Sequence, residues 1–190
     1  MNKLFIGETD WGSPLLPYEN ALLYYVYGRV TLNTVWFLFL LPSIFYFFHH
    51  SIEVSFKTLL KLKNVPYPTR GLGGHNISNL LKIIVDSQLF SPEVNELTNS
   101  EDLAELLTAM DKSYMNNKYS FCGYNINFPL REVVDMTISV IFREINSIME
   151  QKTPPHASAK LYVTEPIEEA FLKDLKALFG EYHINSIREH

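Results

Sequence analysis

The sequence predicts an all-α protein, an antiparallel up-and-down helical bundle with a C-terminal accessory helix. Three observations support this class. Apolar residues recur at steps of three and four over several long segments, which is the period of an amphipathic helix. The connections between these segments are mostly short, as they are in antiparallel bundles. No segment shows the regular alternation of apolar and polar residues that would predict a half-buried strand.

The composition fits a cytoplasmic chain with one core. A length of 190 residues is enough for one well-filled domain, and 13 Phe and 11 Tyr favour a thick core or a buried interface. The single cysteine, Cys122, excludes an internal disulfide framework and a Cys-based zinc cluster. The N-terminal residues lack the apolar stretch of a signal peptide, so we expect no export signal.

The charge is unevenly distributed. The net charge of −5 argues against general nucleic-acid affinity, although residues 54–85 contain five Lys and Arg and no acid. Residues 93–111 show the reverse pattern, with acids and no base. The alternative to a basic patch is that these charges complement helix dipoles.

The apolar run over residues 35–48 decides between a membrane anchor and a soluble bundle. It is shorter than the roughly 20 residues needed to cross a bilayer. Pro42 and Ser43 interrupt it, and both residue types are common where helices start. We therefore expect one helix over 18–40 and a second over 42–64, and no membrane association. The alternative is a small membrane-associated protein anchored through this run.

The remaining segments follow the same period. Residues 65–74 form a connection rich in Pro and Gly. Asn76 is expected to cap a third helix that ends near Leu89, and Ser100 to open a fourth. A fifth helix beginning at Pro129 is expected to be central to the core, because its apolar positions keep a regular helical spacing: Val134, Ile138, Ile141, Ile145 and Ile148.

The chain is expected to divide after residue 152. Residues 1–152 form the bundle, with a core from about residue 18. Residues 153–190 comprise a linker and an amphipathic helix that packs on the bundle or on a dimer mate. The apolar face of that helix is made by Ile167, Phe171, Leu175 and Leu178.

Three stretches, in order, resemble one known family. FFHHSIEVSFKTLLKLKN has three polar residues at four-residue steps: His49, Glu53 and Lys57. GGHNISNLLKII begins with Gly-His and continues with paired leucines. DKSYMNNKYSF ends a helix with Tyr114, Lys118 and Tyr119. Together these stretches, within residues 18–152, resemble the HEPN (higher eukaryotes and prokaryotes nucleotide-binding) family, helical domains often found beside nucleotidyltransferases and in toxin pairs.

The resemblance implies a homodimer. It also implies a nucleotidyltransferase as a possible partner protein and a toxin–antitoxin pair as a possible biological role. Many HEPN domains are RNases that carry an Arg and a His, with four to six residues between them, near the start of the last core helix. Arg131 and Arg143 lie on that helix, but neither is followed by His at these offsets. The resemblance therefore favours a non-catalytic module that binds a nucleotide, a nucleic acid or a protein. The alternative is a metal-independent RNase that uses Arg70 and His75, which do show the spacing.

The RGLGGH stretch is the first candidate ligand site. Gly73 and Gly74 permit close backbone approach, and Arg70 can donate charge-assisted hydrogen bonds to a phosphate. The N–H groups at the start of the next helix, after His75, would add to an anion site. The alternative is that the glycines serve only the turn.

The second candidate is the polar stripe on the helix expected over 42–64. His49, Glu53 and Lys57 share one face, and the connection returns His75 towards them. Two ligands at i and i+4 with a third from a neighbour can hold zinc. The commoner alternative is a hydrogen-bonded polar seam in which Lys57 neutralises Glu53, so we expect no metal and no cofactor.

Overall fold

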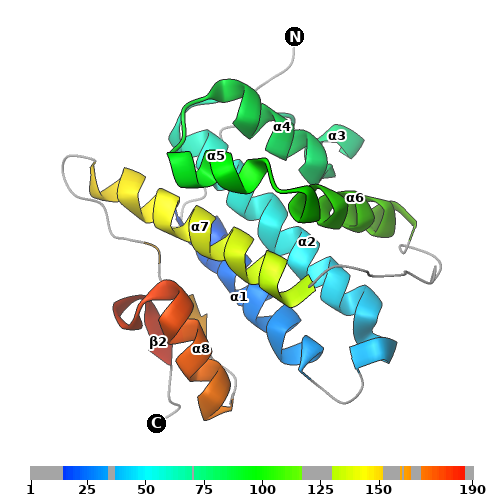
Figure 1. Ribbon diagram of the computed structural model, residues 1–190, viewed down its shortest axis with the longest axis vertical. Coiled ribbons are helices and arrows are strands. Elements are labelled where there is room, and N and C mark those ends of the chain that lie inside the picture. The colour runs from blue at the N-terminus through cyan, green and yellow to red at the C-terminus, as the bar shows by residue number, and fades with distance from the viewer. Residues whose placement is uncertain are drawn as a thin grey trace.

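The structure, a computed structural model, describes residues 15–33, 37–69, 71–116, 130–151, 159, 161–163 and 168–186. Its bundle consists of helices, and an accessory helix lies near the C-terminus, as the sequence predicts (Figure 1). Within the described residues, no helix is both long enough and apolar enough to cross a bilayer.

The first two helices are α1 (Leu16–Leu32) and α2 (Phe37–Leu62). The predicted break at Pro42 is wrong, because Pro42 lies inside α2 and the chain leaves α1 at Asn33. Pro42 removes one backbone N–H from the helix. The rings that follow it, Phe45 and Phe48, are buried in the core, and this packing compensates for the lost hydrogen bond.

Gly28 brings α1 and α2 into close contact. A Cβ atom at this position would lie 2.4 Å from Cε1 of Phe48. The Phe48 ring therefore occupies the space that any larger residue at position 28 would need. The absence of a side chain serves helix packing here, although Gly lowers the intrinsic stability of α1.

Four helices follow α2 along the chain: α3 (Gly71–His75), α4 (Ile77–Ser87), α5 (Pro92–Thr98) and α6 (Glu101–Asn116). Of these, α4 and α6 pack against α2. Asn76 caps α4 as predicted, since its side chain accepts a hydrogen bond from the Asn79 N–H at 2.6 Å. The sequence predicted neither α3, which replaces the end of the expected connection, nor α5, which begins with Ser91 as its cap and Pro92 in its first turn.

The central helix is α7 (Leu130–Glu150), which packs against α2, α5, α6 and α8 (Figure 1). Its predicted apolar face is confirmed, because all five of its members are buried: Val134, Ile138, Ile141, Ile145 and Ile148.

The C-terminal part contains β1 (Leu161–Val163), α8 (Glu169–Phe179), a 3-10 turn (Glu181–His183) and β2 (Ile184–Ser186). The two short strands pair in parallel, with Leu161 opposite Ile184, and were not predicted. α8 packs on the bundle of its own chain. Phe179 contacts the rings of Tyr25 and Phe142 edge to face, at centroid distances of 5.5 and 5.0 Å.

Candidate functional site

The structure brings four of the predicted site residues together. His49, Glu53 and Lys57 lie on one face of α2, and α3 places His75 beside them. His49 and Glu53 are 1% and 3% exposed, whereas the His75 side chain is 45% exposed. The cluster therefore extends from the core to the surface. Arg70 lies outside the described residues.

Glu53 is the centre of this cluster. Its Oε1 accepts hydrogen bonds from Lys57 Nζ at 2.5 Å and from His75 Nδ1 at 3.2 Å. Its Oε2 lies 3.8 Å from His49 Nδ1. Burial alone would raise the pKa of Glu53, but the hydrogen bond and charge of Lys57, helped by His75, hold that pKa below its usual value. Glu53 is therefore ionised at neutral pH, and Lys57 neutralises it as the polar-seam alternative expects.

Asp111 of α6 joins the cluster to the start of α4. Its two oxygens accept hydrogen bonds from the backbone N–H of Ile77 at 2.9 Å and of Ser78 at 3.0 Å. Asp111 Oδ1 also lies 3.4 Å from Nε2 of His49. Burial would raise the pKa of Asp111, but these hydrogen bonds hold it below its usual value. The amides that an anion could have used at this helix start already donate to Asp111.

Asp111 was not among the predicted site residues. Its partners lie between 33 and 62 positions earlier in the chain, so no local spacing points to it. The sequence shows it only as the last acid of the stretch 93–111.

The glycines of RGLGGH have a local packing role. Gly74 is buried, and a Cβ there would lie 2.9 Å from the carbonyl carbon of Thr69. Gly73 is exposed, and the nearest atom to a Cβ would be Cβ of Pro68 at an ordinary 3.8 Å. Gly74 thus allows the connection to fold back on α3.

Tyr114, near the end of α6, covers the two histidines. Its ring stacks on His49 at a centroid distance of 4.4 Å and an interplanar angle of 7°. It also stacks on His75 at 5.7 Å and 28°. The resemblance singled out Tyr114 but not this stacking. Lys118 and Tyr119, the other two residues of that stretch, lie outside the described residues.

A pocket of about 440 Å³ opens beside Tyr114, between the first half of α2 and the end of α6. We call it the Tyr114 pocket. Half of its lining residues are Phe or Tyr, and two serines and one histidine supply polar groups. The lining residues are Pro42, Ser43, Phe45, Tyr46, Phe47, His49, Ser113 and Tyr114. Tyr46 is 49% exposed and is therefore accessible to a ligand from solvent. This volume is within the range of small-molecule sites.

The Glu53–His75 pair could also act in proton transfer. When Nδ1–H of His75 donates to Glu53, Nε2 of the exposed ring keeps its lone pair and can accept a proton. Within the described part of the chain, no group of three or more His, Cys, Asp or Glu side chains is arranged to hold a metal ion.

Comparisons with protein-family models, with curated proteins and with solved structures find no match to this chain.

Proposed function

We propose that the protein is a non-catalytic, HEPN-like helical module that binds the base of a nucleotide or of a nucleic acid in the Tyr114 pocket. The supporting observation is the Tyr114 ring, which stacks on His49 and His75 and also lines a pocket of base-accommodating size. Stacking of a base on an aromatic side chain contributes about 1–3 kcal/mol and tolerates different bases. Serine hydroxyls at positions 43 and 113 line the same pocket and supply polar groups beside its rings.

Tyr46 offers the cleanest test because truncating a half-exposed side chain spares the core. We expect Tyr46→Ala to weaken the binding of AMP or of a short oligoribonucleotide about tenfold, the effect of one lost stacking contact. Tyr182→Ala is the matched control, since Tyr182 is 73% exposed and does not line the pocket. Isothermal titration calorimetry measures both variants. Equal affinity of the two variants, or no binding by the wild type, would reject the proposal.

A second candidate is a metal-independent RNase with His75 as the base and Arg70 as the phosphate-binding residue. The Glu53–His75 hydrogen bond favours it, because a carboxylate that orients a half-exposed histidine is typical of general bases. This candidate predicts cleavage of labelled RNA in the presence of EDTA, with loss of activity in His75→Ala. A wild-type chain that leaves the RNA intact would favour the non-catalytic module.

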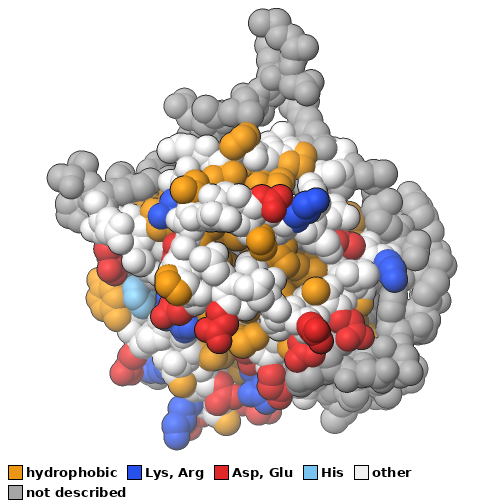
Figure 2. Space-filling view, turned by 45° about the horizontal axis from the view of Figure 1, so that its top comes forward, with side chains coloured by type: hydrophobic (Ala, Val, Ile, Leu, Met, Phe, Trp, Pro, Cys, Tyr) orange, Lys and Arg blue, Asp and Glu red, His pale blue; other side chains and the backbone are white. Residues whose placement is uncertain are grey.

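The proposal includes a homodimer and a cytoplasmic location. Hydrophobic side chains reach the surface on the face shown in Figure 2. The exposed large hydrophobic residues of the described chain include Tyr27, Tyr46, Leu89 and Met136. Such side chains are available for contact with a second copy or with a partner protein such as a nucleotidyltransferase. The single cysteine supports a reducing compartment. Sedimentation equilibrium measures the mass, and a monomer at all concentrations would remove the dimer from the proposal.

A further inference from the structure

A buried arginine outside the Tyr114 pocket has hydrogen-bonding groups without a partner among the described residues. Arg29 of α1 is 0% exposed. Its Nε lies 3.0 Å from Oδ1 of Asp135 on α7. In the described part of the chain, neither Nη1 nor Nη2 has a hydrogen-bond partner. A buried guanidinium normally has its donors satisfied, so this arrangement is unusual.

Two residues already orient this guanidinium from the α1 and α7 side. Asp135 forms the ion pair with Nε and also accepts a hydrogen bond from the Tyr25 hydroxyl at 2.6 Å. Because the carboxylate is held from two directions, the position of Nε is restrained, and the unused Nη groups have a defined orientation. A planar fork of this kind matches the paired oxygens of a phosphate.

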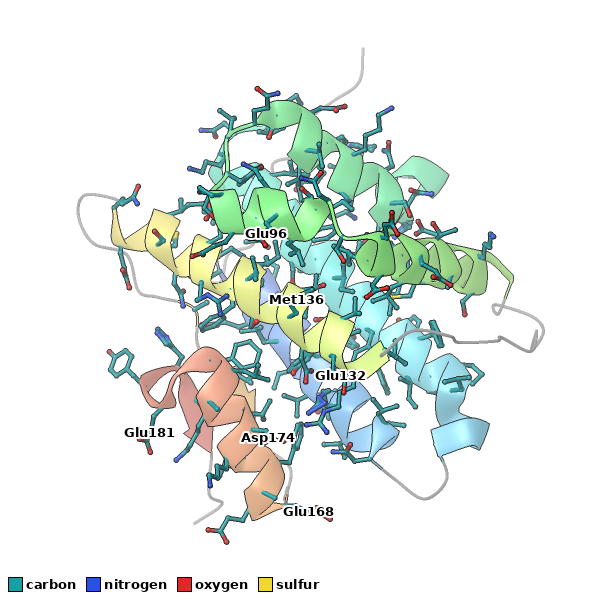
Figure 3. All side chains as sticks on the ribbon, viewed as in Figure 1. Glu96, Glu132, Met136, Glu168, Asp174 and Glu181 are labelled. Carbon is teal, nitrogen blue, oxygen red and sulfur yellow. The ribbon has the colours of Figure 1, made fainter. Side chains whose placement is uncertain are left out.

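α8 closes the site. The centroid of the Phe171 ring lies 5.1 Å from Cζ of Arg29, in cation–π contact. A second link to α8 is the ion pair between Arg131 Nη2 and Asp174 Oδ2 at 3.0 Å, and Asp174 is labelled on α8 in Figure 3. Because Arg29 is fully buried, nothing of the size of a water molecule can reach it while α8 is in place.

Movement of α8 would produce a positively charged site. Arg131 Nε lies 3.7 Å from Oδ2 of the same Asp135, so Arg29 and Arg131 share one carboxylate. Without Asp174, two guanidinium groups would face a single carboxyl group.

We propose that Arg29 and Arg131 form a phosphate-binding site that Phe171 of α8 keeps closed. A phosphate group would replace the Phe171 ring as the partner of the Arg29 Nη groups, and it would bind in competition with the docking of α8. This inference goes beyond the proposed function, since the residues belong to α1, α7 and α8 and none of them lines the Tyr114 pocket.

Phe171→Ala, which removes the ring over Arg29, provides the test. Tyr182→Ala is the control, because Tyr182 lies outside α8, is 73% exposed and leaves the ring over Arg29 in place. We expect inorganic phosphate to bind Phe171→Ala about tenfold more tightly than it binds Tyr182→Ala or the wild type, as one charge-assisted hydrogen bond predicts. Adding Arg29→Met to Phe171→Ala should abolish the gain. Calorimetric titration gives the affinities, and circular dichroism checks the helix content of each variant.

A second titration with a short single-stranded RNA distinguishes free phosphate from a phosphodiester backbone. A gain with either ligand that requires Arg29 supports the proposal and names the source of the phosphate. No gain with both ligands, or a gain that survives Arg29→Met, overturns it.

If Arg29→Met does not fold, hydrogen exchange of the wild-type chain decides. Faster amide exchange in residues 169–179 on addition of phosphate supports a site that competes with α8, whereas unchanged exchange overturns it.

Discussion

Replacement of Gly28 by Ala is expected to destabilise the bundle, although Ala is the better helix former. The added Cβ would lie 2.4 Å from Cε1 and 2.6 Å from Cδ1 of Phe48, whose side chain is fully buried. Carbon atoms pack best at about 3.5–4.0 Å, so the overlap is about 1 Å. Overpacking costs about 1–3 kcal/mol, and an overlap with a buried ring belongs near the upper value. The helix propensity of Ala returns about 1 kcal/mol. The net loss in the free energy of unfolding is therefore about 2 kcal/mol.

Urea denaturation followed by circular dichroism measures this loss as a lower midpoint with an unchanged m-value. Gly73→Ala is the control, because its Cβ meets only Pro68 at 3.8 Å and should leave stability unchanged or slightly raised. A Phe48→Leu background removes the ring atoms in conflict, so Gly28→Ala should cost little there. The explanation fails if Gly28→Ala is as stable as the wild type, or if its cost is the same in the Phe48→Leu background.

Three further predictions concern the polar cluster and its neighbours. Asp111→Ala should lower the free energy of unfolding by about 2–4 kcal/mol in urea denaturation, because the N–H groups of Ile77 and Ser78 lose their acceptor. Asp111→Asn should lower it less, because the amide keeps one acceptor oxygen. The pKa values of Glu53 and Asp111 are lowered in the folded state, so both groups contribute stability. This contribution is fully present above their unfolded pKa values and is lost as the pH falls through the folded pKa values. A Glu53→Gln, Asp111→Asn variant should therefore lose stability less steeply below about pH 4 in acid titration. Asn76→Ala should cost about 1 kcal/mol in thermal unfolding, as the loss of a helix cap does, and no change would mean that Asp111 alone caps α4.

The sequence predicted the helix faces because a helix face is a local property. The apolar positions of the fourth predicted helix are all buried in α6: Leu103, Leu106, Leu107 and Met110. Pro42 and Pro92 show that a local rule for proline does not determine where a helix begins. Pro42, which was predicted to start a helix, lies inside α2, whereas Pro92, where no helix was predicted, begins α5. Whether a helix continues through a proline depends on what the following turns bury, which is a tertiary property.

The candidate site was likewise predictable only where its geometry depends on local spacing. The four-residue spacing of His49, Glu53 and Lys57 places them on one face of α2 by helix geometry alone, and the return of His75 followed from the short connection. The role of Asp111 did not follow, because its partners come from α2 and α4 and depend on how α6 packs between them. The stacking of Tyr114 on both histidines depends on the same packing.

The polar cluster adds little to the stability of the bundle compared with apolar residues at the same positions. Taking a carboxylate and an ammonium group out of water costs several kcal/mol per ion, which the ion pair and hydrogen bonds of Glu53 only offset. A Leu and Met seam of equal volume would hold α2 against α4 and α6 at least as well. Beside this seam lies the Tyr114 pocket, and Tyr114 itself contacts both histidines. The cluster is consistent with the ligand that we propose for the adjoining pocket, since His49 and His75 stack on Tyr114, the ring on which that ligand would stack.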